Sequence, residues 1–277
     1  PVHREPIRLT PARLVLIAAG LLIVWAGLSV GAYVIWTQGA PHLDFFPIWG
    51  GARLTLFDDY QLYDEETTRA AQLLLYGRLL PPDVDQQGFS YPAQIIVQLA
   101  PFWFIDNVRV ATAIWQATSV FLLVASIIAL LTLFDDVPRW LLLPALLWQY
   151  VLLMLFQAQF SGIAFATLAF GYLLYHHERD FWAGIVLALG MVKPELIVVP
   201  LVALSLNALV NRRWGLLIGI TACGLTLLII TVAMFGWWVP GWFSQIAAYQ
   251  GYAQSAFALV TAWHTQPLLA TVVVLLM

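Results

Sequence analysis

One acidic side chain in this 277-residue chain stands where acids are rarely found. Asp44 lies shortly after the end of the first long apolar segment and is followed by aromatic residues. Burial at such a place raises the pKa of a carboxyl group and a nearby cation keeps it ionised; either state suits a general base acting on a hydroxyl. Pro47 favours the first helical position, so we expect Phe46 to be the N-cap, with Asp44 too early to cap. A solvated loop carboxylate is the alternative.

A single basic side chain raises a similar question. Lys193 lies where two short apolar segments meet, and Pro194 keeps it out of helical geometry. A charged side chain at membrane level costs free energy, so we expect such a residue to have a function. Two interpretations are open. The lysine either reaches the membrane surface or pairs with Glu195, or it binds an anionic headgroup, most naturally a phosphate.

Other polar residues interrupt or border apolar segments. Gln157 and Gln159 break an apolar helical hairpin, and their amides either bond between helices or contact a sugar or phosphate. Tyr91 ends the polar loop where the chain re-enters the membrane, and an aromatic-belt role is its simplest interpretation. His264 is either a surface histidine at a helix start or part of a site with the others.

The composition identifies the environment of these side chains. Hydrophobic residues make up 62% of the chain and charged residues only 10%, which predicts an all-α integral membrane protein. The net charge of −3 does not favour nucleic-acid binding. The chain contains no P-loop, dinucleotide fingerprint, zinc motif or nucleophile elbow. A nucleotide-driven pump is therefore not supported.

The elements that position the candidate residues follow from the apolar segments. We expect a single transmembrane domain over residues 1–277, with a first span at 14–36 preceded by three arginines that mark a cytoplasmic N-terminus. Residues 37–105 form a large extracytoplasmic loop with short interfacial or re-entrant helices. The stretch 95–105 is too short to span and is broken by Pro101. Residues 106–277 supply the further spans.

The arginines test this topology. If 95–105 does not cross the membrane, the loops with Arg139, Arg179 and Arg212 all lie on the cytoplasmic side, as the positive-inside rule requires. The same assignment brings four features together on the opposite side. They are the Asp44 loop, the 157–159 turn, residues 193–195 and the aromatic-rich segment 237–264.

Several short motifs occur in a fixed order along the chain. They are Asp44-Phe45-(x)6-Ala52-Arg53, Leu62-Tyr63-Asp64, Phe89-Ser90-Tyr91-Pro92 leading to Ala100-Pro101, Gln159, and Ala183-Gly184-Ile185 with Lys193-Pro194. This order resembles glycosyltransferase family 87, over residues 14–264. The family belongs to the GT-C class of integral membrane glycosyltransferases, which includes bacterial polyprenyl-phosphate-mannose-dependent mannosyltransferases. Because the family is usually longer, we expect further helices beyond Met277.

The resemblance implies a GT-C type helix bundle and an inverting transfer of mannose, or another hexose or pentose, from a polyprenyl-phosphate donor to a lipid or glycan acceptor. It makes Asp44 the catalytic base and Lys193 the contact to the donor phosphate. The substrate-binding residues that we expect are Lys193, Gln159, Tyr91, His264, Arg53 and Glu195. No cofactor or metal is implied, and the partners are the lipid-linked donor, the acceptor and membrane lipids.

The expected location is the bacterial plasma (inner) membrane, with the site extracytoplasmic and a role in cell-envelope glycolipid synthesis. Two alternatives from other classes stay open at this point. The first is a lipid or solute transporter with Lys193 in a midplane site, and the second is a non-catalytic membrane subunit. One cavity shared by Asp44 and Lys193, rather than a pathway reached from both sides, would favour the enzyme.

Overall fold

The computed structural model describes residues 10–36, 44–133, 137, 138, 140, 144, 146, 147 and 149–250. These residues form helices and no strands, which confirms the predicted all-α membrane fold. The elements are α1 (Pro11–Trp36), α2 (Phe45–Phe57), α3 (Glu65–Tyr76), α4 (Gln94–Gln98), α5 (Ala100–Trp103), α6 (Val108–Leu131), α8 (Gln149–Phe156), α9 (Ser161–His176), α10 (Asp180–Leu189), the 3-10 helix η2 (Gly190–Val192), α11 (Pro194–Val210), α12 (Trp214–Phe235) and α13 (Val239–Gln250).

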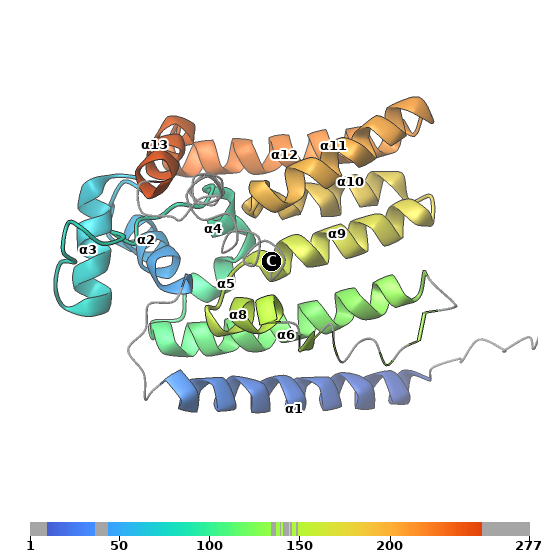
Figure 1. The fold of residues 1–277 in the computed structure, drawn as a ribbon, viewed down its shortest axis with the longest axis horizontal. Helices are drawn as coiled ribbons and strands as arrows, with labels where there is room; N and C mark the ends of the chain where they lie inside the picture. Colours follow the sequence, from blue (N-terminus) through green and yellow to red (C-terminus); the bar gives the residue numbers. More distant parts are fainter. Residues whose placement is uncertain are drawn as a thin grey trace, which may run out of the picture.

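Three of the described helices are long and apolar enough to cross a membrane: α1 over Arg13–Ile35, α6 and α12. Helices α1, α6, α9, α10 and α12 pack side by side in that order, as Figure 1 shows. The outermost helix, α1, contacts α6 through a 3.2 Å hydrogen bond from Trp25 Nε1 to Thr118 Oγ1. Most of its other side chains are exposed, as expected for a helix that faces lipid.

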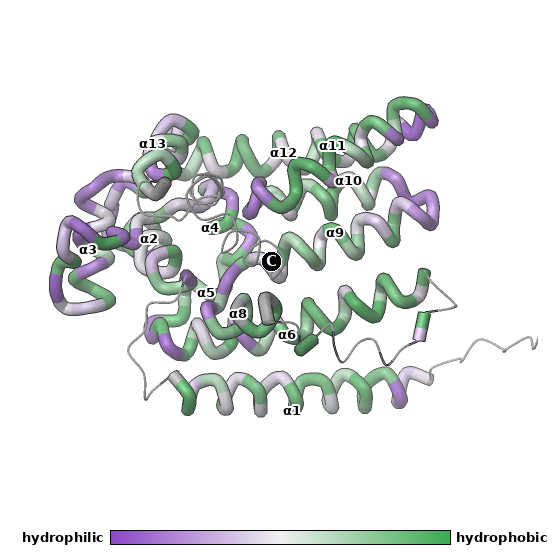
Figure 2. Tube along the Cα trace, in the orientation of Figure 1, coloured by the Kyte–Doolittle hydropathy of each residue, from purple (hydrophilic) through white to green (hydrophobic). Residues whose placement is uncertain are grey.

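The polar residues collect at the two ends of this stack (Figure 2). One end carries the α9–α10 and α11–α12 turns, which Arg213 joins by donating to the Asp180 carboxylate and to the Tyr175 carbonyl oxygen. The other end carries α2, α3 and α13, with α4 and α5 nearby (Figure 1). The apolar lengths between the two ends match a protein that spans a bilayer.

Two glycines let α10 and α12 cross closely. A Cβ added to Gly184 would lie 2.2 Å from the Leu216 carbonyl oxygen, and one added to Gly219 would lie 2.1 Å from the Phe181 carbonyl oxygen. Backbone contact of this kind requires small residues, and it is a common way for helices to associate in membranes. The crossing therefore fixes α10, which leads directly to the break before α11.

That break occurs at Lys193. The chain tightens into η2 after α10, and Lys193 then adopts a non-helical conformation with φ −124° and ψ 77°. Pro194, the first residue of α11, causes this, because its ring disfavours helical geometry in the preceding residue while its own φ suits a helix start. The lysine side chain is thus released from the helical path.

The loop between α1 and α6 folds into four short helices rather than a span. Helices α4 and α5 contain five and four residues, so neither crosses a bilayer. Gln94 Nε2 donates a 3.0 Å hydrogen bond to the Met191 carbonyl oxygen, which ties α4 to η2. Helix α13 packs over this region, and Gly236 turns the chain into it with φ 69° and ψ −165°.

Helix α2 begins earlier than the sequence indicated. Its first residue is Phe45, and Asp44 occupies the N-cap position without a side-chain capping bond. The expectation that Phe46 caps the helix is wrong because Pro47 sits at the third helical position. The first backbone N–H groups of a helix have no partner inside it, so the missing N–H of proline costs nothing there. The Asp44 carboxylate remains available for other contacts.

Candidate active site

A cavity of about 760 Å³ lies where the polar loop, η2 and α13 meet. Asp44, Tyr91, Gln159, Lys193 and Glu195 all line it, although they come from four separate parts of the chain. Its remaining walls include the apolar side chains of Ile48, Trp242 and Ile246. Five of the residues that the sequence singled out therefore share one space.

The position of Asp44 is fixed by its neighbour. The Phe45 ring is fully buried and packs against the rings of Trp103, Trp115 and Phe160, with centroid distances of 5.9, 6.3 and 5.7 Å. These rings come from α5, α6 and the turn before α9. Burial of such an aromatic cluster stabilises the fold by roughly several kcal/mol. The aromatic cluster anchors the start of α2, so the adjacent carboxylate has a defined place at the cavity.

The electrostatic environment of Asp44 suits a base. Burial raises the pKa of its carboxyl group above the ordinary value, and the negative charge of Asp85 raises it further. The positive charge of Lys193 and a hydrogen bond from the Gln159 side chain lower the pKa and partly offset the effect of burial. A carboxylate whose proton affinity is raised, with partners that still favour ionisation, can accept a proton from a hydroxyl.

Gln159 belongs to a short polar chain in the turn between α8 and α9. Its Nε2 donates to Gln157 Oε1 at 2.7 Å, and its Oε1 accepts from Ser161 Oγ at 3.3 Å. Ala158, between the two glutamines, has a left-handed φ of 52°, and its carbonyl oxygen accepts a 3.1 Å bond from Trp115 Nε1. These bonds orient the Gln159 amide toward the carboxylate of Asp44.

Lys193 is held in the cavity wall with only 14% of its side chain exposed. Its Nζ lies 3.8 Å from Glu195 Oε1 and 5.7 Å from the centroid of the Tyr91 ring. The Glu195 side chain is 62% exposed, so solvent screens this ion pair. The ammonium group therefore keeps most of its capacity to bind an anion that enters the cavity.

Tyr91 forms the floor beneath the lysine. Its ring meets Phe160 edge to face at 5.1 Å, and its carbonyl oxygen accepts a 2.8 Å bond from the Tyr63 hydroxyl. Burial raises the pKa of the Tyr63 hydroxyl above its ordinary value, which favours the protonated phenol that donates this bond. The Leu62-Tyr63-Asp64 motif thus supports the Tyr91 backbone rather than lining the cavity itself.

One residue of the expected substrate-binding set, Arg53, is placed differently. Arg53 does not line the cavity; it donates to the Trp103 carbonyl oxygen at 2.7 Å and to Asp106 at 2.9 Å, with its guanidinium over the Trp49 ring. It ties α2 to the segment after α5. His264 lies outside the described residues.

The cavity also contains residues that the sequence did not single out. Asp85 and Gln87 reach it from the polar loop, and Trp242 reaches it from α13. Trp242 Nε1 donates a 3.0 Å bond to the Ser90 carbonyl oxygen, which fastens α13 to the loop. The sequence gives little indication that these residues line the cavity, because Asp85 is one of many acids in that loop and Trp242 is one of thirteen tryptophans.

Within the described part of the chain, no three His, Cys, Asp or Glu side chains gather closely enough to hold a metal ion. The site thus combines a carboxylate, an amide and a lysine with an apolar wall. Such a set can deprotonate a hydroxyl and bind an anion that carries an apolar chain.

Comparison with known proteins gives one match. No curated protein and no solved structure matches the chain. A family model, that of glycosyltransferase family 87, matches residues 89–277, which is more than half of the sequence. The matched region contains Tyr91, Gln159, Lys193, Glu195 and His264, whereas Asp44 and Arg53 precede it. The chain belongs to glycosyltransferase family 87 and is a membrane glycosyltransferase.

Proposed function

We propose that this glycosyltransferase transfers a sugar, mannose or another hexose or pentose, from a polyprenyl-phosphate donor to a hydroxyl of a lipid or glycan acceptor. The observation that carries the proposal is the shared cavity of Asp44 and Lys193. A base for the acceptor and a cation for the donor phosphate face the same space, next to apolar walls suited to a prenyl chain. The donor itself supplies the activated sugar, so no nucleotide is required.

The transfer step follows from these positions. Asp44 takes the proton from the acceptor hydroxyl while the hydroxyl oxygen attacks the anomeric carbon of the donor. The bond between that carbon and the phosphate oxygen breaks, and its electron pair leaves with polyprenyl phosphate. Lys193 stabilises the developing negative charge on the leaving phosphate. Attack opposite the leaving group inverts the anomeric configuration.

The arginines in the short turns between the helices support an extracytoplasmic site, which we propose to lie in a bacterial plasma membrane. Arg179, Arg212 and Arg213 lie in the turns at one end of the helix stack, and none of the residues that line the cavity comes from these turns. Arginine-rich ends favour the cytoplasmic side. The cavity would then open on the opposite face, where envelope glycolipids and glycans are completed. Among the described residues, no observation favours the pathway through the stack that a transporter needs.

Membranes that contain the chain should form a labelled glycolipid or glycan when supplied with one of a panel of radiolabelled polyprenyl-phosphate hexoses and pentoses. Asp44→Asn should lower turnover by about a hundredfold or more, because general-base catalysis contributes at least this much. The matched control is Asp58→Asn, which removes an exposed acid of the same loop. Near-normal turnover by an Asp44→Asn protein that inserts and melts like the wild type would refute the assignment.

A further inference from the structure

One carboxylate in the cavity wall, that of Asp85, has no part in the transfer step described above. Asp85 lines the cavity and is half-buried. The neighbouring acids of the polar loop, Asp58, Asp59, Asp64 and Asp83, are all exposed. Removing a carboxylate from water costs free energy unless something compensates it. The half-buried position of Asp85 therefore requires an explanation that the other loop acids do not.

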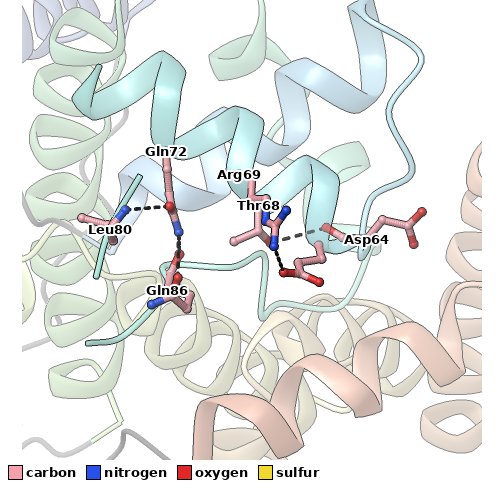
Figure 3. A network of polar contacts seen from close by, with 7 residues as sticks. Asp64, Thr68, Arg69, Gln72, Leu80 and Gln86 are labelled. Carbon is pink, nitrogen blue, oxygen red and sulfur yellow. Dashed lines mark hydrogen bonds and ion pairs between the residues drawn. The ribbon is translucent and has the colours of Figure 1, made fainter. Parts of the chain in front are cut away.

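The loop that carries Asp85 is clamped in place by a buried amide (Figure 3). Gln72, 2% exposed, donates from Nε2 to the Gln86 carbonyl oxygen at 2.8 Å and accepts at Oε1 from the Leu80 N–H at 2.9 Å. The Gln86 side chain in turn donates to the carbonyl oxygens of Pro81 and Val84, both at 2.7 Å. These bonds hold residues 80–86 in one conformation, and this conformation determines the position of Asp85.

Within that loop the Asp85 carboxylate is oriented by two hydrogen bonds from Gln87. One oxygen accepts from the Gln87 backbone N–H at 2.9 Å, and the other accepts from Gln87 Nε2 at 3.1 Å. Gln87 adopts a left-handed φ of 56°, which closes this turn. Both residues line the cavity. The carboxylate is thus held still, with further lone pairs open to accept hydrogen bonds.

No cation among the described residues forms an ion pair with Asp85. The ammonium group in the cavity, that of Lys193, lies beside Glu195 instead. The cavity therefore has one wall with a cation and another with a fixed group that only accepts hydrogen bonds. An anionic phosphate is attracted to the first and repelled by the second. The wall that contains Asp85 is therefore better suited to a neutral group with several O–H donors.

We propose that Asp85, oriented by Gln87, binds an acceptor hydroxyl adjacent to the one that Asp44 deprotonates. The acceptor is then a sugar or polyol headgroup with adjacent hydroxyls rather than an alcohol with one hydroxyl. This inference rests on the proposed function, since it assigns the acceptor side of the same cavity. The electrostatic coupling of Asp85 to Asp44 agrees with their facing one substrate.

The test uses pairs of synthetic acceptors that differ by one adjacent hydroxyl. Octyl α-D-mannopyranoside and its monodeoxy derivatives represent the sugar arm, and 1-O-octylglycerol and 3-octyloxy-1-propanol represent the polyol arm. Each is assayed in membranes with the polyprenyl-phosphate sugar that gives Asp44-dependent product. In the wild type, removal of the adjacent hydroxyl should lower kcat/KM by about tenfold or more, as expected for a hydrogen bond to a charged group.

Asp85→Asn should lower kcat/KM for the complete acceptor by the same factor. Removal of the adjacent hydroxyl from the acceptor should then lower kcat/KM of this variant little further, and the KM for the donor should stay unchanged. Asp83→Asn, the exposed acid two residues away, should behave as the wild type. The proposal is overturned if Asp85→Asn keeps the full deoxy penalty, or if octanol serves as well as the diols. Failure of the proposed function looks different, because then no donor gives an Asp44-dependent product.

Discussion

The backbone N–H of Asp44 donates a 3.1 Å hydrogen bond to the carbonyl oxygen of Gln157. The segment after the first membrane helix is thereby joined to the turn between α8 and α9, more than a hundred residues later in the chain. Gln159, two residues after this contact, then lies beside the Asp44 side chain. The proposed base and the amide that lowers its pKa are held by the same backbone contact.

The first prediction concerns the pH dependence of transfer. A base acts when ionised, so kcat/KM should fall as the pH falls through the raised pKa of Asp44. Gln159→Leu removes a hydrogen bond that lowers this pKa, so the acidic limb should move to higher pH. Asp85→Asn removes a charge that raises the pKa, so the limb should move to lower pH. Shifts of the same sign in the two variants would contradict the assignment of the limb to Asp44.

The second prediction uses the fact that Lys193 is the only lysine in the chain. Lysine-directed acylation, followed by peptide mass spectrometry, should modify this side chain, and a polyprenyl-phosphate sugar should protect it. Lys193→Met should raise the KM for the donor by about tenfold or more, because a charge-assisted phosphate contact is lost. Glu195→Gln, which alters only the exposed partner, should change this KM much less. Equal donor KM values in Lys193→Met and wild type would exclude the phosphate contact.

The third prediction separates structure from substrate binding at Arg53. Arg53→Met leaves the Trp103 carbonyl oxygen without its donor, so the melting temperature in detergent should fall by an amount that corresponds to about 1–3 kcal/mol. The KM values for donor and acceptor should stay near those of the wild type, because Arg53 lies outside the cavity. Arg69→Met, which breaks only an exposed pair with Glu65, is the control. A tenfold rise in either KM without loss of stability would restore the substrate-binding role expected from the sequence.

The fourth prediction concerns the α10–α12 crossing. Gly184→Ala places a methyl group 2.2 Å from a backbone oxygen, so the helices must separate at a cost of about 1–3 kcal/mol. The melting temperature should fall, and turnover should fall with it, because α10 leads to Lys193. Gly224→Ala on α12 is the matched control, since nothing lies within 4 Å of its added methyl. Equal melting temperatures for the two variants would show that the crossing yields more easily than its geometry indicates.

The sequence predicted the helical membrane fold because apolar length and arginine position are strong signals in a membrane chain. It also allowed Asp44, Gln159 and Lys193 to be grouped, since counting crossings fixes which turns share an end. The structure brings these three side chains to one cavity. Their roles in transfer remain the proposals that the experiments above test.

The sequence could not show which of the many loop acids folds inward. Asp85 and Asp83 are two residues apart and look equivalent in the sequence. The bonds from Gln72, a residue with no apolar periodicity to mark it, help to hold the loop so that Asp85 faces the cavity. For Arg53, the motif could not distinguish a ligand contact from a bond to the α5 backbone, because both use the same guanidinium donors.

Gly236 determines where helix α13 can lie against the cavity. With φ 69° and ψ −165°, this residue occupies a region of backbone space that is essentially open to glycine alone. The direction in which the chain leaves α12, and so the placement of Trp242 and Ile246 in the cavity wall, depends on the absence of one side chain. In evolution or design, any other residue at position 236 therefore strains the backbone unless the chain covers the cavity by another path.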